Sequence, residues 1–344
     1  MAIRISMGHV DTYDDRTAAF ARQLGLRSVQ LHTPSNLSGT TGHWTVAELR
    51  ALRERCEADG LPLEGLENVP LAHFGKIQRG EPGRDEQIEN YQTTIRNMAE
   101  AGIRLLGYNF IATYVWRTEM GAGGRGGARV TAYDGAKAHE GNALAAYKLT
   151  PAVSGREPIT AATMWANHQY FLDAVLPVAE ECGVRLALHP DDPPVDEPLG
   201  GAARIFTSPA ALARAHEQAG GAACWGLNLC LGTVSEMGGE TAVNEVIDFF
   251  GPRNAICYVH FRDVRGTVPS FAECFLGEGN FSPARVIRRL VSTGFDSFLI
   301  DDHVPAVIGD LDTWGDTSSE AYCGRGRAHA IGYLQGVLNG LGID

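Results

Sequence analysis

The chain has 344 residues, of which 44% are hydrophobic and 20% are charged, so it carries enough apolar material for a large folded core. Its 29 Lys and Arg residues against 41 Asp and Glu residues give a net charge of −12, which makes nucleic acid and anionic membrane surfaces poor partners. The sequence shows neither a membrane-spanning apolar run nor a signal segment, and its seven cysteines include no CxxC pair. We therefore expect a cytoplasmic protein with reduced thiols.

Short apolar segments rich in β-forming residues recur along the chain and predict strands at 2–7, 27–32, 62–67, 103–110, 184–189, 224–229, 255–260 and 297–301. Amphipathic segments between them predict helices at 17–25, 45–60, 88–102, 159–183, 208–220, 242–251, 282–294 and 324–342. Eight strand-then-helix units in this length predict a single (β/α)8 TIM barrel over residues 1–344. A doubly wound sheet is the competing fold, but the first turn, MGHVDTYDD, lacks the glycines of a phosphate-binding turn.

Residues 111–158 interrupt this rhythm between the fourth strand and its helix. The segment contains GAGGRGGAR at 121–129, which lacks both the Lys-Ser/Thr and the strand-to-helix context of a phosphate loop. In a barrel, this connection lies on the face that carries the active site. We therefore expect a lid over that face, and an insertion without function is the alternative.

Residues able to bind a metal stand at the ends of consecutive predicted strands. His189 ends the fifth strand, Cys230 follows the sixth and His260 ends the seventh. The eighth ends in two carboxylates, Asp301 and Asp302, and the spacing does not choose between them. Each residue alone is more often a packed or hydrogen-bonded group than a ligand. Because the carboxyl ends of barrel strands converge, the set together predicts a site for a divalent transition ion.

Two further groups accompany this site. In HPDDPP (189–194), Asp191 and Asp192 follow a candidate ligand, where they would orient its imidazole or else form an acidic turn stiffened by proline. Arg325 and Arg327 precede the last predicted helix, and an arginine there would suit a substrate that carries a carboxylate. Solvated arginines at the start of the helix are the alternative reading.

Several ordered motifs resemble those of the mannonate dehydratase family, metal-dependent lyases in the xylose-isomerase-like group of TIM barrels. They extend from about residue 60 to 340 and are GRDEQIENYQTTIRNMAEAGIRLLGYNF (83–110), WRT (116–118), LALHPDDPP (186–194), GLNLCLGT (226–233), VHFRDVRG (259–266), DDH (301–303) and RAHAIGYLQG (327–336). The combination of HPDDPP, an NLC strand end and VHFRDV is specific. The resemblance implies loss of water from a sugar acid such as D-mannonate, giving a 2-keto-3-deoxy acid, by a homo-oligomeric enzyme.

The resemblance also implies residue roles. A manganese ion, Mn2+, is implied on the positions that match the family's ligands, namely His189, Cys230, His260 and Asp302, and Asp302 is selected because the family pattern is Asp followed directly by His. Acid/base roles are implied for His303 and Tyr322, without assigning which does which. Substrate contacts are expected from residues within the matched motifs, namely Asn109, Trp116, Arg117, Arg262 and Arg327.

The residue chemistry fits this reaction independently. Removing a proton beside a carboxylate builds negative charge on its oxygens, and a bound cation stabilises that charge. A base must take the proton and an acid must protonate the leaving hydroxyl, and the unperturbed pKa of a histidine such as His303 suits either role. A thiolate ligand favours a softer ion than magnesium, so manganese rests on the resemblance alone.

The chain departs from the family pattern in two places. Ile300 and Asp301 replace an Arg-Pro pair, and ENVPLAH (67–73) replaces a Glu-Ser-Val-Pro-Val-His-Glu-like run, which places His73 one residue late. GEGNFSP (277–283) is in addition similar to a segment of sugar isomerases. Two alternatives therefore remain: a metal-dependent sugar isomerase or epimerase on the same barrel, and a relative that binds a sugar acid without turnover.

Overall fold

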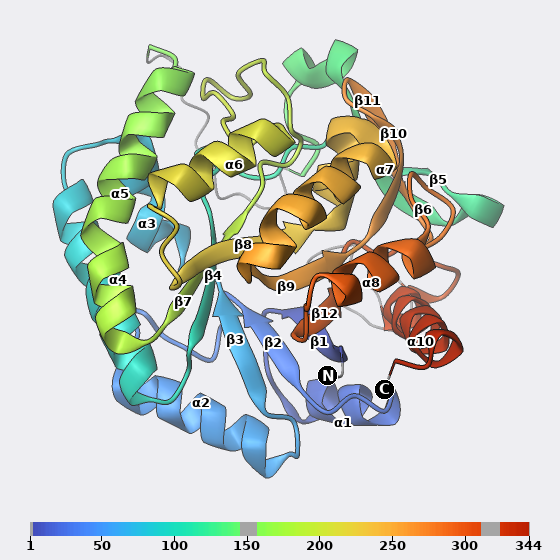
Figure 1. The fold of residues 1–344 in the computed structure, drawn as a ribbon, viewed down its shortest axis with the longest axis horizontal. Helices are drawn as coiled ribbons and strands as arrows, with labels where there is room; N and C mark the ends of the chain where they lie inside the picture. The colour runs from blue at the N-terminus through green and yellow to red at the C-terminus, as the bar shows by residue number, and fades with distance from the viewer. Residues whose placement is uncertain (1–2, 145–156, 311–323, 344) are drawn as a thin grey trace.

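The computed structural model describes residues 3–144, 157–310 and 324–343. Within these residues, parallel strands close into a barrel in the order β1-β12-β9-β8-β7-β4-β3-β2, which Figure 1 shows surrounded by helices. The barrel strands are β1 (Arg4–Val10), β2 (Val29–His32), β3 (Leu63–Glu67), β4 (Leu105–Asn109), β7 (Arg185–His189), β8 (Trp225–Cys230), β9 (Ile256–Phe261) and β12 (Phe298–Asp301). The predicted barrel is confirmed, and each predicted strand overlaps an observed one.

The helices follow the strands as expected, with two differences. They are α1 (Asp15–Gln23), α2 (Val46–Ala58), α3 (Leu71–Arg79), α4 (Arg84–Glu100), α5 (Ala161–Cys182), α6 (Pro209–Gln218), α7 (Leu231–Phe250), α8 (Pro283–Ser292) and α10 (Gly324–Leu341). Helix α3 was not predicted. Helix α7 begins well before residue 242, because the Cys230 side chain caps it and only Gly238 and Gly239 interrupt its helical backbone. No described helix is long and apolar enough to span a membrane.

The barrel interior supports the polar end of β3. The Tyr258 ring stacks on Phe298 with centroids 5.1 Å apart, and its hydroxyl donates to Glu67 Oε2 at 2.9 Å. A Cβ at Gly107 would lie 2.2 Å from the Tyr258 hydroxyl, so glycine leaves the room that this hydroxyl needs. The packed core therefore reaches directly to a buried carboxylate near the carboxyl ends of the strands.

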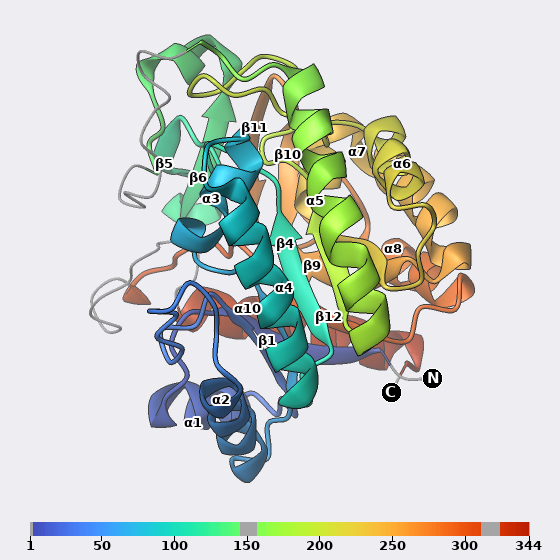
Figure 2. The same ribbon diagram turned by 90° about the vertical axis from the view of Figure 1, so that its left-hand side faces the viewer.

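A second, antiparallel sheet stands beside the barrel. Its strands, in the order β10-β11-β6-β5, are β10 (Asp263–Thr267), β11 (Ser270–Cys274), β6 (Arg129–Asp134) and β5 (Glu119–Gly123). Figure 2 shows β5, β6 and β11 gathered at one end of the molecule, and Figure 1 shows β5 and β6 on the side away from α3. The segment 111–158 therefore contributes two strands where a loop was expected, and its residues 145–156 lie outside the described ranges. Its action as a lid stays a prediction.

The GEGNFSP segment forms an anchored loop next to this sheet. The Asp263 carboxylate accepts hydrogen bonds from the backbone N–H groups of Gly277 (3.2 Å), Gly279 (3.0 Å) and Asn280 (3.0 Å). The motif that resembled an isomerase segment thus has a structural role, because it ties the end of β11 to the start of β10.

Candidate active site

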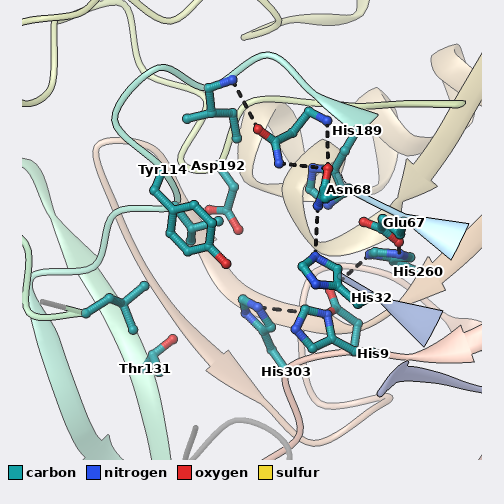
Figure 3. Close-up of a pocket in the computed structure, with 15 residues that line it drawn as sticks. His9, His32, Glu67, Asn68, Tyr114, Thr131, His189, Asp192, His260 and His303 are labelled. Atoms are coloured by element: carbon teal, nitrogen blue, oxygen red, sulfur yellow. Dashed lines mark hydrogen bonds and ion pairs between the residues drawn. The ribbon is translucent and has the colours of Figure 1, made fainter. Parts of the chain in front are cut away.

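A pocket opens where the carboxyl ends of the barrel strands converge, and Figure 3 shows its lining. One wall carries His189, His260 and Asp302, which come from the β7, β9 and β12 strand ends. The other wall carries His9, His32 and Asn68 from the ends of β1 to β3. The barrel order separates these two groups of strands, so a ligand in the pocket lies between them.

The residues predicted as metal ligands converge in the structure. His189, Cys230 and His260 each offer one ligand atom, and these atoms lie within 4.8 Å of one another. The Asp302 Oδ2 atom lies 3.8 Å from Cys230 Sγ and 3.7 Å from His260 Nδ1. Two imidazoles and one thiol therefore meet in one place, and the Asp302 carboxyl group lies beside two of them.

The histidine ring contacts show that the ligand nitrogens are available to a metal. His189 Nδ1 lies 2.6 Å from the Pro190 carbonyl oxygen, and His260 Nε2 lies 2.9 Å from Glu67 Oε2, so each of these nitrogens donates its proton there. The opposite nitrogen of each ring then keeps a lone pair. His260 Nδ1 is buried and has no hydrogen-bond partner among the described residues. An orphaned acceptor beside a thiol and a carboxylate fits a metal ligand.

The charged neighbours of Cys230 and Asp302 favour the ionised forms of both side chains. Burial raises the pKa of the Cys230 thiol, but the Arg262 guanidinium and the two imidazoles outweigh burial and hold the pKa well below its usual value. The Sγ atom also accepts a hydrogen bond from Thr233 Oγ1 at 3.2 Å. Burial likewise raises the pKa of Asp302, but the neighbouring His303, His260 and Arg262 lower it well below its usual value. A thiolate, a carboxylate and two imidazoles suit a divalent transition ion.

Glu67 is a site residue that sequence analysis did not assign. Its buried carboxylate accepts hydrogen bonds from His260 Nε2 (2.9 Å), Gln30 Nε2 (3.0 Å), Asn228 Nδ2 (3.1 Å) and the Tyr258 hydroxyl. Burial raises its pKa, but the facing imidazole of His260 is the main cause that lowers the pKa to about 2. The available signal was its position at the end of the third predicted strand.

Among the described residues, the His189 ring bonds to the Pro190 carbonyl, and the carboxylates of Asp191 and Asp192 bond to other partners. Asp191 Oδ2 accepts the backbone N–H of Phe206 at 2.9 Å, which fixes the turn after β7. Asp192 Oδ2 lies 2.9 Å from Arg117 Nη2 and 2.7 Å from Arg262 Nη2. Arg262 Nε in turn lies 3.1 Å from Asp302 Oδ2. Asp192 therefore acts on a candidate ligand through a guanidinium.

The residues predicted to contact the substrate separate into two groups. Asn109 lines the pocket. Arg117 and Arg262 are buried behind it in ion pairs with protein carboxylates. Arg327 Nε is 2.8 Å from Asp301 Oδ2, also outside the lining, and Trp116 lines a second cavity with Tyr133 and Leu199. Arg327 and Asp301 thus neutralise each other at the position where the chain departs from the family pattern.

His303 lines the pocket, and its ring is oriented by the second sheet. Its Nδ1 atom forms a short hydrogen bond with Glu273 on β11, a residue that sequence analysis did not assign. The same carboxylate accepts from Arg117 Nη2 at 2.9 Å. The backbone of His303 has φ of 36°, a conformation that a non-glycine residue adopts only when its surroundings enforce it. Tyr322 lies outside the described residues.

The fold and the pocket together define a protein of the TIM-barrel class with a candidate metal centre at the carboxyl ends of its strands. The family model described as D-mannonate dehydratase (UxuA) matches residues 33–342. The chain belongs to this family and is a hydro-lyase, as the resemblance of its motifs implied.

Relatives and solved structures agree with this assignment. The chain is 30% identical over 316 residues to mannonate dehydratase 2 of Halalkalibacterium halodurans, covering 86% of this chain and 87% of that protein. It is 29% identical over 325 residues to the mannonate dehydratase of Thermotoga neapolitana, with 86% and 85% covered. The mannonate dehydratase structure from Streptococcus suis serotype 2 aligns with a TM-score of 0.81 and 26% identity, over 98% of this chain and 96% of that one. An L-ribulose 3-epimerase aligns with a TM-score of 0.59 and 16% identity, which shows the shared fold alone.

Proposed function

We propose that the protein is a metal-dependent dehydratase that removes water from D-mannonate, or from a closely similar aldonic acid, to give a 2-keto-3-deoxy acid. The observation that carries this proposal is the grouping of His189, Cys230 and His260 with Asp302 beside them at the pocket, in a chain of the D-mannonate dehydratase family. Isomerisation and epimerisation have only the shared fold in their favour.

Dehydration breaks the C2–H bond and the C3–O bond of the acid, and the enol that results rearranges to the 2-keto-3-deoxy product. Removal of the C2 proton places negative charge on the substrate carboxylate. A divalent ion held by His189, Cys230, His260 and Asp302 supplies a Lewis acid for that charge. We propose Mn2+ as this ion, on the basis of the family resemblance.

His303 is proposed to move a proton at its Nε2 atom. Its Nδ1–H donates to Glu273, so the lone pair of the neutral ring lies on Nε2. The site thus presents an imidazole held in one tautomer and one orientation, as proton transfer requires. Tyr322 is proposed as the second proton-transfer group, so that one residue takes the C2 proton and the other protonates the leaving hydroxyl.

The test is a dehydration assay on D-mannonate with protein purified in added Mn2+, beside a sample treated with EDTA and a sample to which Mn2+ is returned. We expect a 2-keto-3-deoxy acid, detected by the periodate–thiobarbiturate reaction, only in the samples with metal. Metal binding without any product from a panel of aldonic acids would overturn the proposed reaction. Conversion of a sugar without water loss would favour the epimerase alternative.

We further propose that the enzyme is a cytoplasmic homo-oligomer. The family resemblance and the frequency of symmetric assemblies among soluble enzymes support this proposal. Light scattering on the eluting peak of a sizing column tests the subunit number.

A further inference from the structure

The pocket wall opposite the candidate metal ligands is made of neutral hydrogen-bonding side chains. His9, His32, Asn68 and Asn109 come from the ends of β1, β2, β3 and β4, and all line the pocket. These four strands are adjacent in the barrel, whereas the candidate ligands come from the adjacent strands β7, β8, β9 and β12. In the closed barrel β4 neighbours β7 and β1 neighbours β12, whereas β2 and β3 stand across from β8 and β9. A molecule that reaches the metal centre with one end can therefore meet His32 and Asn68 with the other.

The hydrogen bonds within the wall run in one direction. Asn109 Nδ2 donates to Asn68 Oδ1 at 3.0 Å, and Asn68 Nδ2 donates to His32 Nε2 at 2.8 Å. Because His32 Nε2 accepts, the proton of the neutral ring lies on Nδ1. The described residues make no other hydrogen bond to this ring, so its Nδ1–H is available as a donor to a bound molecule.

Backbone strain gathers along the same wall. His9, Thr33 and Asn68 have φ angles of 48°, 42° and 57°. Each lies at or directly after the end of its strand. Side chains disfavour this left-handed region, and such residues are typical of binding and catalytic sites, where the surrounding structure holds them.

The wall is suited to hydroxyl groups. The His9 and His32 rings stack with centroids 4.2 Å apart, and Figure 3 shows both rings beside His303. Burial lowers the pKa of each ring, so both are neutral near pH 7. Neutral imidazoles and carboxamides can donate as well as accept, which matches an alcohol, whereas a carboxylate needs donors and positive charge.

We propose that His32 and Asn68, with His9 stacked on His32, bind the hydroxyl tail of the sugar acid, at the carbons beyond C4. The carboxylate end then faces His189, His260 and Asp302. This subsite sets the preference for chain length and for configuration in the tail. The inference rests on the proposed function for the class of substrate.

The experiment compares a six-carbon aldonic acid, D-mannonate, with a four-carbon acid of the same configuration at C2 and C3. Both are assayed with wild type and with His32→Phe, which keeps a ring against His9 but removes the donor. We expect His32→Phe to lower kcat/KM for the six-carbon acid about tenfold, the loss of one good hydrogen bond. For the four-carbon acid, kcat/KM should change less than about twofold between wild type and variant, because this acid lacks the tail.

Two further variants make the result specific. His216→Phe is the matched control, because His216 packs on Trp225 and Phe250 and does not line the pocket. Its replacement should leave kcat/KM unchanged for both acids. His32→Gln restores a neutral donor and acceptor and should recover part of the six-carbon preference. If His32→Phe fails to fold, His32→Leu, which also removes the donor, replaces it in the comparison.

The outcomes separate this inference from the proposed function. If the wild type is active and the variants lower kcat/KM equally for both acids, or for neither acid, the proposed subsite is wrong. The proposed dehydratase activity is then unaffected. If the wild type is inactive, calorimetric binding of the same two acids to the metal-loaded proteins decides. If the wild type binds the six-carbon acid more tightly than the four-carbon acid, and His32→Phe abolishes this difference in affinity, the subsite is supported independently of the reaction. If the two acids bind equally well, or neither binds, the subsite is wrong.

Discussion

Among single residues, Glu67 contacts the candidate metal centre without being a predicted ligand. Its carboxylate holds the His260 Nε2 proton and thereby leaves Nδ1 to the metal. Glu67→Gln replaces one acceptor oxygen by an amide donor, so the orientation of the imidazole is lost. We expect affinity for Mn2+ to fall about 10–100-fold, measured by calorimetric titration of the metal-free protein. Glu64→Gln on the same strand, whose carboxylate pairs with Arg4 at the surface, should bind Mn2+ as wild type does.

Glu273 has the corresponding role for His303. It accepts from His303 Nδ1 and is itself held by Arg117 Nη2 at 2.9 Å. In Glu273→Gln the amide no longer selects the tautomer with the lone pair on Nε2. We expect kcat to fall about 10²–10⁴-fold, the range for loss of general acid/base catalysis, with smaller change in KM and none in metal content. Glu278→Gln, at an exposed ion pair with Arg265, is the control, and equal losses in both variants would contradict the role of Glu273.

At the scale of elements, short connections between strand and helix fix the site. Cys230 is the last residue of β8 and also the N-cap of α7, where its Sγ accepts from the Thr233 backbone N–H at 3.5 Å. The candidate ligand is therefore held between two regular elements and has little freedom. His189 likewise ends β7, and the Asp191 carboxylate holds the turn that follows.

Helix α2 offers a test of local stability with a pH dependence. Thr45 and Glu48 form a capping box, with Thr45 N donating to Glu48 Oε2 at 3.1 Å and Glu48 N donating to Thr45 Oγ1 at 3.3 Å. Burial raises the pKa of Glu48, but the hydrogen bonds from Ser38 and Thr45 lower it from 4.5 to about 2. The carboxylate of Glu48 therefore takes up its proton at a lower pH in the folded state than in the unfolded state. The stability that Glu48 contributes is lost as the pH falls from about 4.5 toward 2.

We expect Glu48→Gln to lower the free energy of unfolding by about 1 kcal/mol at pH 7. The difference from wild type should shrink as the pH falls below about 4.5, because protonation removes the same contribution from the wild type. Urea unfolding followed by circular dichroism at pH 7, 5 and 4 measures this difference. Glu57→Gln on the exposed side of the same helix is the control, and a difference independent of pH would contradict the assignment.

Across the whole molecule, a buried ion-pair network joins the second sheet to the barrel. Arg117, just before β5, pairs with Asp192 after β7 and with Glu273 on β11. Arg262, between β9 and β10, extends the network to Glu236 on α7 and to Asp302. Charges this deeply buried need their partners, because an unpaired one loses hydration without compensation.

Removing one cation from this network should destabilise the whole fold. We expect Arg117→Met to lower the free energy of unfolding by about 3–5 kcal/mol, since it leaves the Asp192 and Glu273 carboxylates buried with one partner fewer. Arg285→Met removes an exposed pair with Glu240 and should cost less than about 1 kcal/mol. Urea unfolding at pH 7 measures both, and similar values would show that the network adds no stability.

Much of this architecture was predictable, and particular residues show where prediction stopped. The eight strands followed from apolar segments, and His189, Cys230 and His260 followed from strand ends that must converge in a barrel. The choice of Asp302 over Asp301 rested on the family resemblance. Helix α3 was missed because it directly follows the short ENVP turn and has no separate apolar strand before it. The strands of the second sheet were missed because β5 is rich in glycine and because its partner β6 pairs on the other side with β11, which is distant in sequence.

The sequence by itself determined the barrel, the family and the side of the barrel on which reactive side chains gather, because periodicity and strand ends are local properties of the chain. Only the tertiary structure decided which of those side chains face the pocket. Arg117, Arg262 and Arg327 became partners of buried carboxylates, whereas Glu67 and Glu273 became the groups that orient His260 and His303. The reason is physical: a buried charge or ring proton must find a partner, and that partner is chosen by distance in the folded chain.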